Sequence, residues 1–286
     1  MDSATPDYGV WPEADIPAHI KDAGSREMSN YTVSLILKQK LIGSGTLIRV
    51  ADTYGILTAA HVAKIVENAD QSVGVNIADH PHGFFIPKQC LEHVVVGASK
   101  SLDDADGPDL SILRILDVND LSTIKSKKSF YPLDKPNLGS FLETLPIGEM
   151  LWYLVGAPDE HCRSEGKFGT RNHILAAKHL VAEATYKKRE VRNDFDFVTL
   201  ELIAGDYSFP SDYGGVSGGG IWLLPLVMNP DVGVSTIAYE APILAGVAFY
   251  QRGVIDGVSD IVCHGPASIY VHAYAKLKDW PSSRVA

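Results

Sequence analysis

Residues 43–61 read Gly43-Ser-Gly-Thr-Leu-Ile-Arg-Val-Ala-Asp-Thr-Tyr-Gly-Ile-Leu-Thr-Ala-Ala-His61. This stretch holds two short apolar runs, at 45–50 and 55–59, and turn-forming residues separate them. Short apolar runs bounded by turn residues are typical of β-strands. We therefore predict two strands here, with His61 placed directly after the second.

Similar short runs continue along most of the chain. They lie at residues 31–37, 94–96, 110–115, 150–155, 197–203, 220–226 and 243–250. Helical patterns are confined to 60–68 and 267–280, and the regular alternation of strands and helices expected of a doubly wound fold is missing. The pattern predicts an all-β fold, either a barrel or a sandwich.

The domain organisation follows from polarity and proline content. Residues 1–30 are polar and turn-rich, so we expect an N-terminal extension. The stretch 131–145, with Pro132 and Pro136 in it and Pro146 directly after it, indicates a boundary between two halves, 31–135 and 136–286.

Composition and charge limit the partners, the cellular location and the cofactors that we expect. The formal net charge of −10 disfavours nucleic acid and anionic lipid as partners. The three cysteines are too few for a disulfide framework, no apolar stretch approaches the ~20 residues of a membrane span, and the first 17 residues lack the features of a signal peptide. We expect a cytoplasmic location, no membrane association, and no metal or other cofactor, because the His and Cys residues lack metal-ligand spacing.

Two further motifs follow the first. Pro108-Asp109-Leu-Ser-Ile-Leu113 begins an apolar run with an acid, and Tyr213-Gly-Gly-Val-Ser217-Gly-Gly-Gly220 places a serine in a glycine-dense turn. A serine hydroxyl becomes a useful nucleophile when a histidine accepts its proton and a carboxylate orients that histidine. The residue types His61, Asp109 and Ser217, each at the end of a predicted strand or in a turn, fit this chemistry.

The three motifs together resemble those of the trypsin-like (chymotrypsin-fold) serine peptidases. Leu57-Thr-Ala-Ala-His61, Asp109-Leu-Ser-Ile-Leu113 and Gly215-Val-Ser217-Gly-Gly219 resemble the histidine, aspartate and nucleophile motifs of that family. The resemblance covers roughly residues 31–280. It implies two six-stranded antiparallel β-barrels with a short C-terminal helix, the first barrel carrying His61 and Asp109 and the second carrying Ser217.

The resemblance also assigns roles. His61 is expected to act as general base and then acid, Asp109 to orient it, and Ser217 to attack a peptide carbonyl. The backbone N–H groups of Gly215 and Ser217 would form the oxyanion hole. The expected substrate is a protein or peptide, and a regulatory partner protein is possible. The residues expected to line the substrate pocket are Ser211, Phe249, Tyr250 and Gln251.

Three positions depart from the family pattern or refine it. Val216 stands where the secreted enzymes carry an aspartate that pairs with a newly cleaved N-terminus, so we expect activity without processing and an oxyanion loop held by other means. The neutral Ser211, six residues before Ser217, favours an apolar side chain of medium or large size over Arg or Lys, whereas a shift of one residue to Asp212 would reverse this preference. Phe249 stands where many relatives have a small polar residue that supports the aspartate.

Two alternatives stay open at this point. A trypsin-like fold can be kept for binding or scaffolding without catalysis. Gly215-Val-Ser217-Gly-Gly219 also satisfies the G-x-S-x-G motif of α/β-hydrolases, whose Ser–Asp–His order could be completed by Asp256 or Asp260 and His264 or His272. The glycines that follow Ser217 disfavour the helix that this motif requires.

Overall fold

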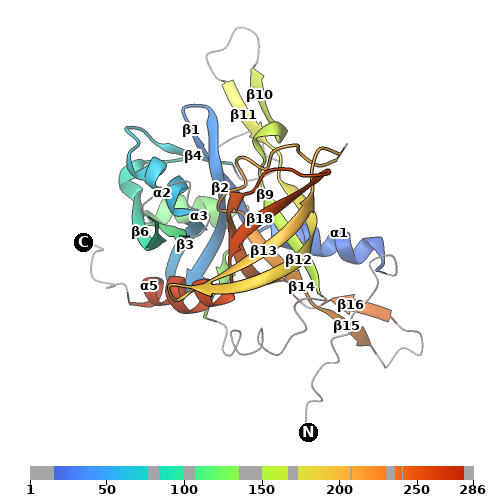
Figure 1. The fold of residues 1–286 in the computed structure, drawn as a ribbon. Coiled ribbons are helices and arrows are strands. Elements are labelled where there is room, and N and C mark those ends of the chain that lie inside the picture. Colours follow the sequence, from blue (N-terminus) through green and yellow to red (C-terminus); the bar gives the residue numbers. More distant parts are fainter. Residues whose placement is uncertain are drawn as a thin grey trace.

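The computed structural model describes residues 16–76, 84–99, 107–134, 150–166, 173–206, 208–229, 236–239 and 241–279. Two mainly antiparallel β structures lie side by side in this part of the chain, with a few short helices around them (Figure 1). The mostly β fold predicted from the sequence is confirmed. The boundary predicted after residue 135 lies outside the described residues.

The first half forms an eight-stranded sheet whose main path runs β5-β4-β1-β2-β3-β7-β6. Its strands are β1 (Thr32–Leu37), β2 (Lys40–Val50), β3 (Thr53–Thr58), β4 (Val73–Asn76), β5 (Phe84–Ile86), β6 (Leu91–Ala98), β7 (Asp109–Ile115) and β8 (Tyr131–Pro132), the last pairing in parallel with β2. The two edge strands, β5 and β6, are joined by the single 3-10 turn η2 (Lys88–Cys90), so the sheet must curl to bring its edges together.

The expected closed barrel is not what the first half shows. β5 has three residues and pairs with β4 alone, and in the described part of the chain no hydrogen-bonded ladder joins β5 to β6. An apolar core packs against the curled sheet and continues into the second half. It includes Val33, Leu35, Leu47, Ile56, Val75 and Leu113, together with Phe197, Phe249 and Val262.

The second half contains a closed barrel with the order β12-β13-β18-β17-β14-β9, in which every pairing is antiparallel. Its strands are β9 (Leu151–Gly156), β12 (Leu180–Arg192), β13 (Phe195–Ile203), β14 (Gly220–Leu224), β17 (Ile243–Gln251) and β18 (Val258–His264). Trp152 and Trp222, predicted as core residues of this half, are 1% and 0% exposed. One of the two predicted six-stranded barrels is thus present.

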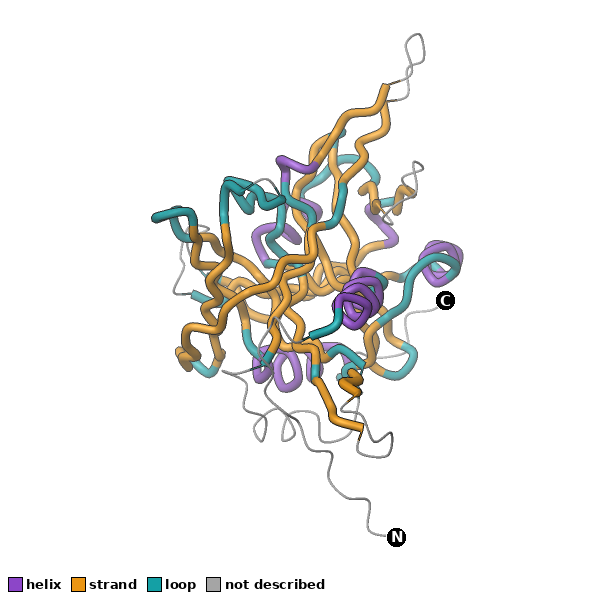
Figure 2. Tube along the Cα trace, turned by 90° about the vertical axis from the view of Figure 1, so that its right-hand side faces the viewer, coloured by secondary structure: helices purple, strands orange, loops and turns teal. Residues whose placement is uncertain are grey.

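Two hairpins project from the barrel in both views (Figures 1 and 2). One pairs β10 (Cys162–Gly166) with β11 (His173–Ala177) and follows the 3-10 turn η4 (Asp159–His161). The other pairs β15 (Leu226–Asn229) with β16 (Thr236–Tyr239).

The helices are short. α2 (Ala60–Glu67) and α3 (Val118–Lys125) belong to the first half, and the predicted C-terminal helix is present as the π-helical segment η6 (Ser268–Ala273) continued by α5 (Tyr274–Lys278). Within the predicted N-terminal extension, α1 (Ala18–Ser29) buries Ile20, Gly24 and Met28. These residues recur every four positions, so one face of α1 packs against the protein. None of the helices in the described ranges combines the length and the hydrophobicity needed to cross a bilayer.

Candidate active site

His61 owes its position to the junction of β3 and α2. The strand ends at Thr58 and the helix begins at Ala60, so the N–H of His61 belongs to the first helical turn, where no intrahelical acceptor is available. Ala59 offers no capping side chain. Instead, Oδ1 of Asp109 accepts the His61 N–H at 2.8 Å. Asp109, the first residue of β7, therefore caps the N-terminus of α2.

The same carboxylate also holds the imidazole. Oδ2 of Asp109 lies 2.5 Å from Nδ1 of His61, and the two side chains are 12% and 25% exposed. A carboxylate at Nδ1 keeps the proton there and leaves Nε2 as the basic nitrogen. Asp109 thus fixes both the backbone and the tautomer of His61.

Asp109 is in turn held by His264, the last residue of β18. The N–H of Asp109 donates to Nε2 of His264 at 2.9 Å, although the two residues are far apart in sequence. Burial lowers the pKa of His264 to about 4, so its imidazole is neutral at pH 7. Because Nε2 accepts a hydrogen bond, the proton of the neutral ring is on Nδ1.

Behind His264 lies a buried polar network. Nδ1 of His264 is 3.4 Å from the hydroxyl of Ser268, and that hydroxyl donates to Oδ1 of Asp196 at 2.8 Å. Asp196 is 1% exposed and its charge is balanced by Arg189, whose Nη2 lies 2.9 Å away. Sequence reasoning considered His264 as a member of another triad and missed this role, because a contact between β18 and β7 leaves no local signal.

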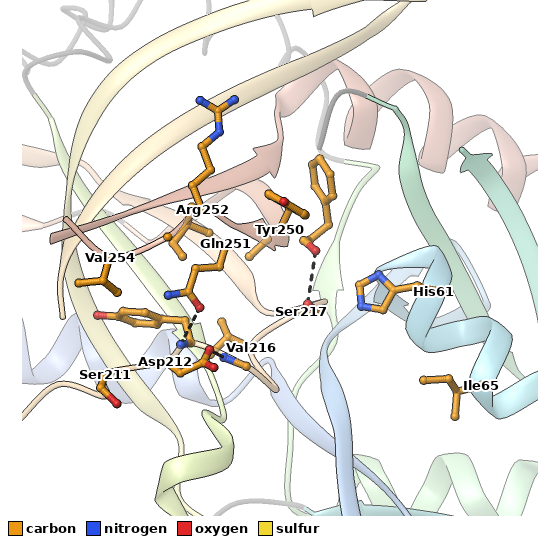
Figure 3. A pocket seen from close by; sticks show the side chains of 16 residues that line it. His61, Ile65, Ser211, Asp212, Val216, Ser217, Tyr250, Gln251, Arg252 and Val254 are labelled. Atoms are coloured by element: carbon orange, nitrogen blue, oxygen red, sulfur yellow. Dashed lines mark hydrogen bonds between the residues drawn. The ribbon is translucent and has the colours of Figure 1, made fainter. Parts of the chain in front are cut away.

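Ser217 lies on the second half, facing His61 across a pocket of about 620 Å³ that both residues line (Figure 3). Its hydroxyl is directed to the carbonyl oxygen of Phe249 at 3.4 Å, which is long for an O–H···O bond. In the described part of the chain, no hydrogen bond joins this hydroxyl to His61. Rotation about χ1 moves a serine hydroxyl between staggered positions, and such contacts often tighten only when substrate binds.

Glycines around Ser217 permit the close approach of the two halves. Gly218 has φ +90°, and a Cβ there would lie 2.1 Å from the carbonyl oxygen of Ser44 and from Oγ1 of Thr58. Gly215 has φ +85°, and a Cβ there would meet the carbonyl oxygen of Ala157 at 2.8 Å. Only glycine fits both the dihedral angle and the space.

The backbone N–H groups of Gly215 and Ser217 donate no hydrogen bond to any residue that the structure describes. The loop that presents them is held by Ser44 on β2. The N–H of Ser44 donates to the carbonyl of Ser217 at 2.8 Å, and the Ser44 hydroxyl donates to the carbonyl of Gly215 at 2.9 Å. The same hydroxyl accepts the N–H of Ala157 at 2.8 Å. Ser44 lies within the stretch 43–61 quoted above, but the partners of its hydroxyl come from the second half.

All four residues predicted for the substrate pocket line the pocket that contains His61 and Ser217. Ser211 is exposed, and its N–H and hydroxyl both donate to Glu160. These contacts lower the pKa of the Glu160 carboxyl. Phe249 is 3% exposed, and its ring packs on His264 with a centroid distance of 4.8 Å. Phe249 thus buries His264, which supports the backbone of Asp109.

The α/β-hydrolase alternative does not fit this arrangement. The element after Ser217 is strand β14, and the surrounding barrel is antiparallel. The two histidines named for that triad contact other groups: His264 binds Asp109, and His272 binds the carbonyl of Asp194 at 2.7 Å.

The described residues contain no group of three or more His, Cys, Asp or Glu side chains that could hold a metal ion.

No protein-family model matches the sequence, and no curated protein is significantly similar to it. The geometry of the pocket is therefore the basis for any functional proposal.

Proposed function

We propose that this chain is a serine endopeptidase of the trypsin-like type, with His61, Asp109 and Ser217 as its catalytic triad. The observation that carries the proposal is the contact between His61 and Asp109, with Ser217 on the opposite side of the same pocket. The carboxylate leaves Nε2 of His61 as the basic nitrogen, and the Ser217 hydroxyl on the opposite wall of the pocket is the nucleophile it would activate.

The reaction would proceed in two stages. As Oγ of Ser217 attacks the peptide carbonyl carbon, Nε2 of His61 takes the hydroxyl proton, and the resulting imidazolium returns it to the leaving amine. An acyl-enzyme ester remains, and water attacks it with His61 again acting as base. The N–H groups of Gly215 and Ser217 would stabilise the oxyanion, because neither is committed to an acceptor among the described residues.

The proposal extends to the fold and the partners. In this interpretation the curled sheet corresponds to the first of the two six-stranded barrels of the family, and the closed barrel to the second. Substrates would be proteins or peptides bound along the pocket, a regulatory partner protein would control access to it, and none of the steps requires a cofactor.

A binding module that has kept the fold is the second candidate. The observation that favours it is the direction of the Ser217 hydroxyl, which contacts the Phe249 carbonyl at 3.4 Å. In such a module the pocket would hold a peptide without cleaving it.

A cleavage assay separates the two candidates. The purified chain and its Ser217→Ala variant are incubated with a diverse peptide library, and new termini are identified by mass spectrometry. We expect cleavage by the wild-type chain and none by the variant. Peptides that bind both proteins and stay intact would favour the binding module.

A further inference from the structure

Gln251 is the last residue of β17, and its side chain crosses the pocket that contains Ser217 (Figure 3). Its Oε1 accepts the N–H of Tyr213 at 2.8 Å, and its Nε2 donates to the hydroxyl of Ser259 at 3.1 Å. One amide therefore connects β17 with the loop that leads to Ser217 and with β18. We call these contacts the Gln251 bridge.

Both ends of the Gln251 bridge are held in place. Ser259 is 1% exposed, and its hydroxyl donates to the carbonyl of Arg252 at 2.8 Å, which leaves its lone pairs for Gln251. Tyr213 is 3% exposed, and its hydroxyl donates to the carbonyl of Ile203 at 2.5 Å. A side chain with two satisfied hydrogen bonds to fixed partners is costly to displace, because its partners lose their bonds as well.

The bridge divides the pocket. Val254 and Arg252 line the pocket beyond the bridge, as seen from Ser217 in Figure 3. The part next to Ser217 is lined by Val216 and Ala248, both 2% exposed. Both of these side chains are apolar, and the Gln251 bridge lies between them and the outer part of the pocket.

We infer that the chain accepts a small side chain, of the size of alanine or serine, on the residue whose carbonyl Ser217 attacks. The inference rests on the proposed function and names the substrate class of the same site. It replaces the sequence-based expectation of a medium or large apolar side chain. A longer side chain would have to break the contact between Gln251 and Tyr213, which would leave both groups without their hydrogen bond.

Peptidyl diphenyl phosphonates with an alanine-like or a phenylalanine-like side chain test this inference, because each phosphonylates the serine and releases phenol. We expect the wild-type chain to react at least about tenfold faster with the small probe. Gln251→Ala should reduce that ratio by about tenfold, because it opens the outer part of the pocket. Gln251→Glu is the matched control: it keeps the length and the acceptor for Tyr213, so it should keep the preference for the small probe.

The outcomes distinguish this inference from the function on which it rests. Equal or faster reaction of the large probe with the wild-type chain would overturn the inference while leaving the peptidase intact. A ratio that Gln251→Ala leaves unchanged, in a variant that still reacts with an unselective fluorophosphonate, would also overturn it. Failure of the wild-type chain to react with that fluorophosphonate would remove the proposed function and the inference together.

Discussion

Ser44 is the residue that best explains how the loop before Ser217 is held. The sequence predicts that Val216 cannot take part in charge pairing with a cleaved N-terminus, so other contacts must fix the loop. Val216 is 2% exposed and packs in the core. The hydroxyl of Ser44, itself buried, satisfies the carbonyl of Gly215 and the N–H of Ala157. A neutral hydrogen-bonded residue thus fixes the loop that would carry the oxyanion hole.

Replacing Ser44 by alanine removes both contacts and leaves two backbone groups without their partner. Loss of a buried hydrogen-bond partner costs about 1–3 kcal/mol. We expect kcat for a cleaved peptide to fall about tenfold to a hundredfold while KM changes less than about threefold, because Gly215 would act mainly on the oxyanion of the transition state.

Thr46 supplies the control for this measurement. It lies on the same strand, is 0% exposed, and its hydroxyl has no hydrogen-bond partner among the described residues. Thr46→Val should leave kcat unchanged. If Ser44→Ala raised KM in step with the loss of kcat/KM, or matched Thr46→Val in both constants, Ser44 would have no part in positioning the loop.

At the scale of elements, the ends of three segments meet behind the pocket. Asp109 begins β7, His61 lies in the first turn of α2, and His264 ends β18. The His264 side chain accepts the backbone N–H of Asp109, and the Asp109 carboxylate binds the backbone N–H and the ring Nδ1 of His61. The position of the imidazole therefore depends on the barrel as well as on its own sheet.

The buried His264 makes stability depend on pH. Its pKa is about 4 in the folded chain, below the ordinary value of 6.5, because burial disfavours the charged ring. Unfolding therefore takes up a proton between these pH values, so the stability is fully present above about pH 6.5 and is lost as the pH falls towards 4. One such histidine contributes a slope of up to about 1.4 kcal/mol per pH unit.

Urea unfolding measured between pH 7 and pH 5 tests this dependence. His264→Gln cannot titrate, so its stability should fall less steeply than that of the wild-type chain, by about one proton. His179, whose pKa burial lowers to about 3, should contribute a second proton that His179→Gln removes independently. Identical slopes for the wild-type chain and His264→Gln would show that His264 is not buried as a neutral ring.

The strands differ in how clearly the sequence predicts them. Strands with continuous apolar runs, such as β3, β7 and β17, are where the sequence predicts them. β12 was not predicted, because most of its residues are partly or fully exposed and its charged residues hide the strand pattern. Lys187 illustrates this: it lies on the surface of the barrel and pairs with Asp260 at 2.9 Å.

At the scale of the whole molecule, local sequence motifs indicate candidate residues for the pocket. Hydrogen bonds between segments far apart in the chain determine how those residues are positioned. Of the residues in the three motifs, His61 and Ser217 line one pocket, and Asp109 contacts His61. The hydrogen bonds of Ser44, Gln251 and His264 join segments far apart in the chain. No spacing rule could have found them. The expected closure of the first sheet depends on pairing between its edge strands, which apolar patterning does not specify.

The proposed peptidase activity depends on His61 activating Ser217 across the pocket. The most direct measurement is mass spectrometry of the intact chain and its tryptic peptides after reaction with a fluorophosphonate, in which the serine oxygen replaces fluoride on phosphorus. We predict one adduct per chain, located on Ser217, and a reaction at least about a hundredfold slower in a folded His61→Ala variant. Labelling of other serines, or equal rates in the wild-type chain and in His61→Ala, would contradict the account.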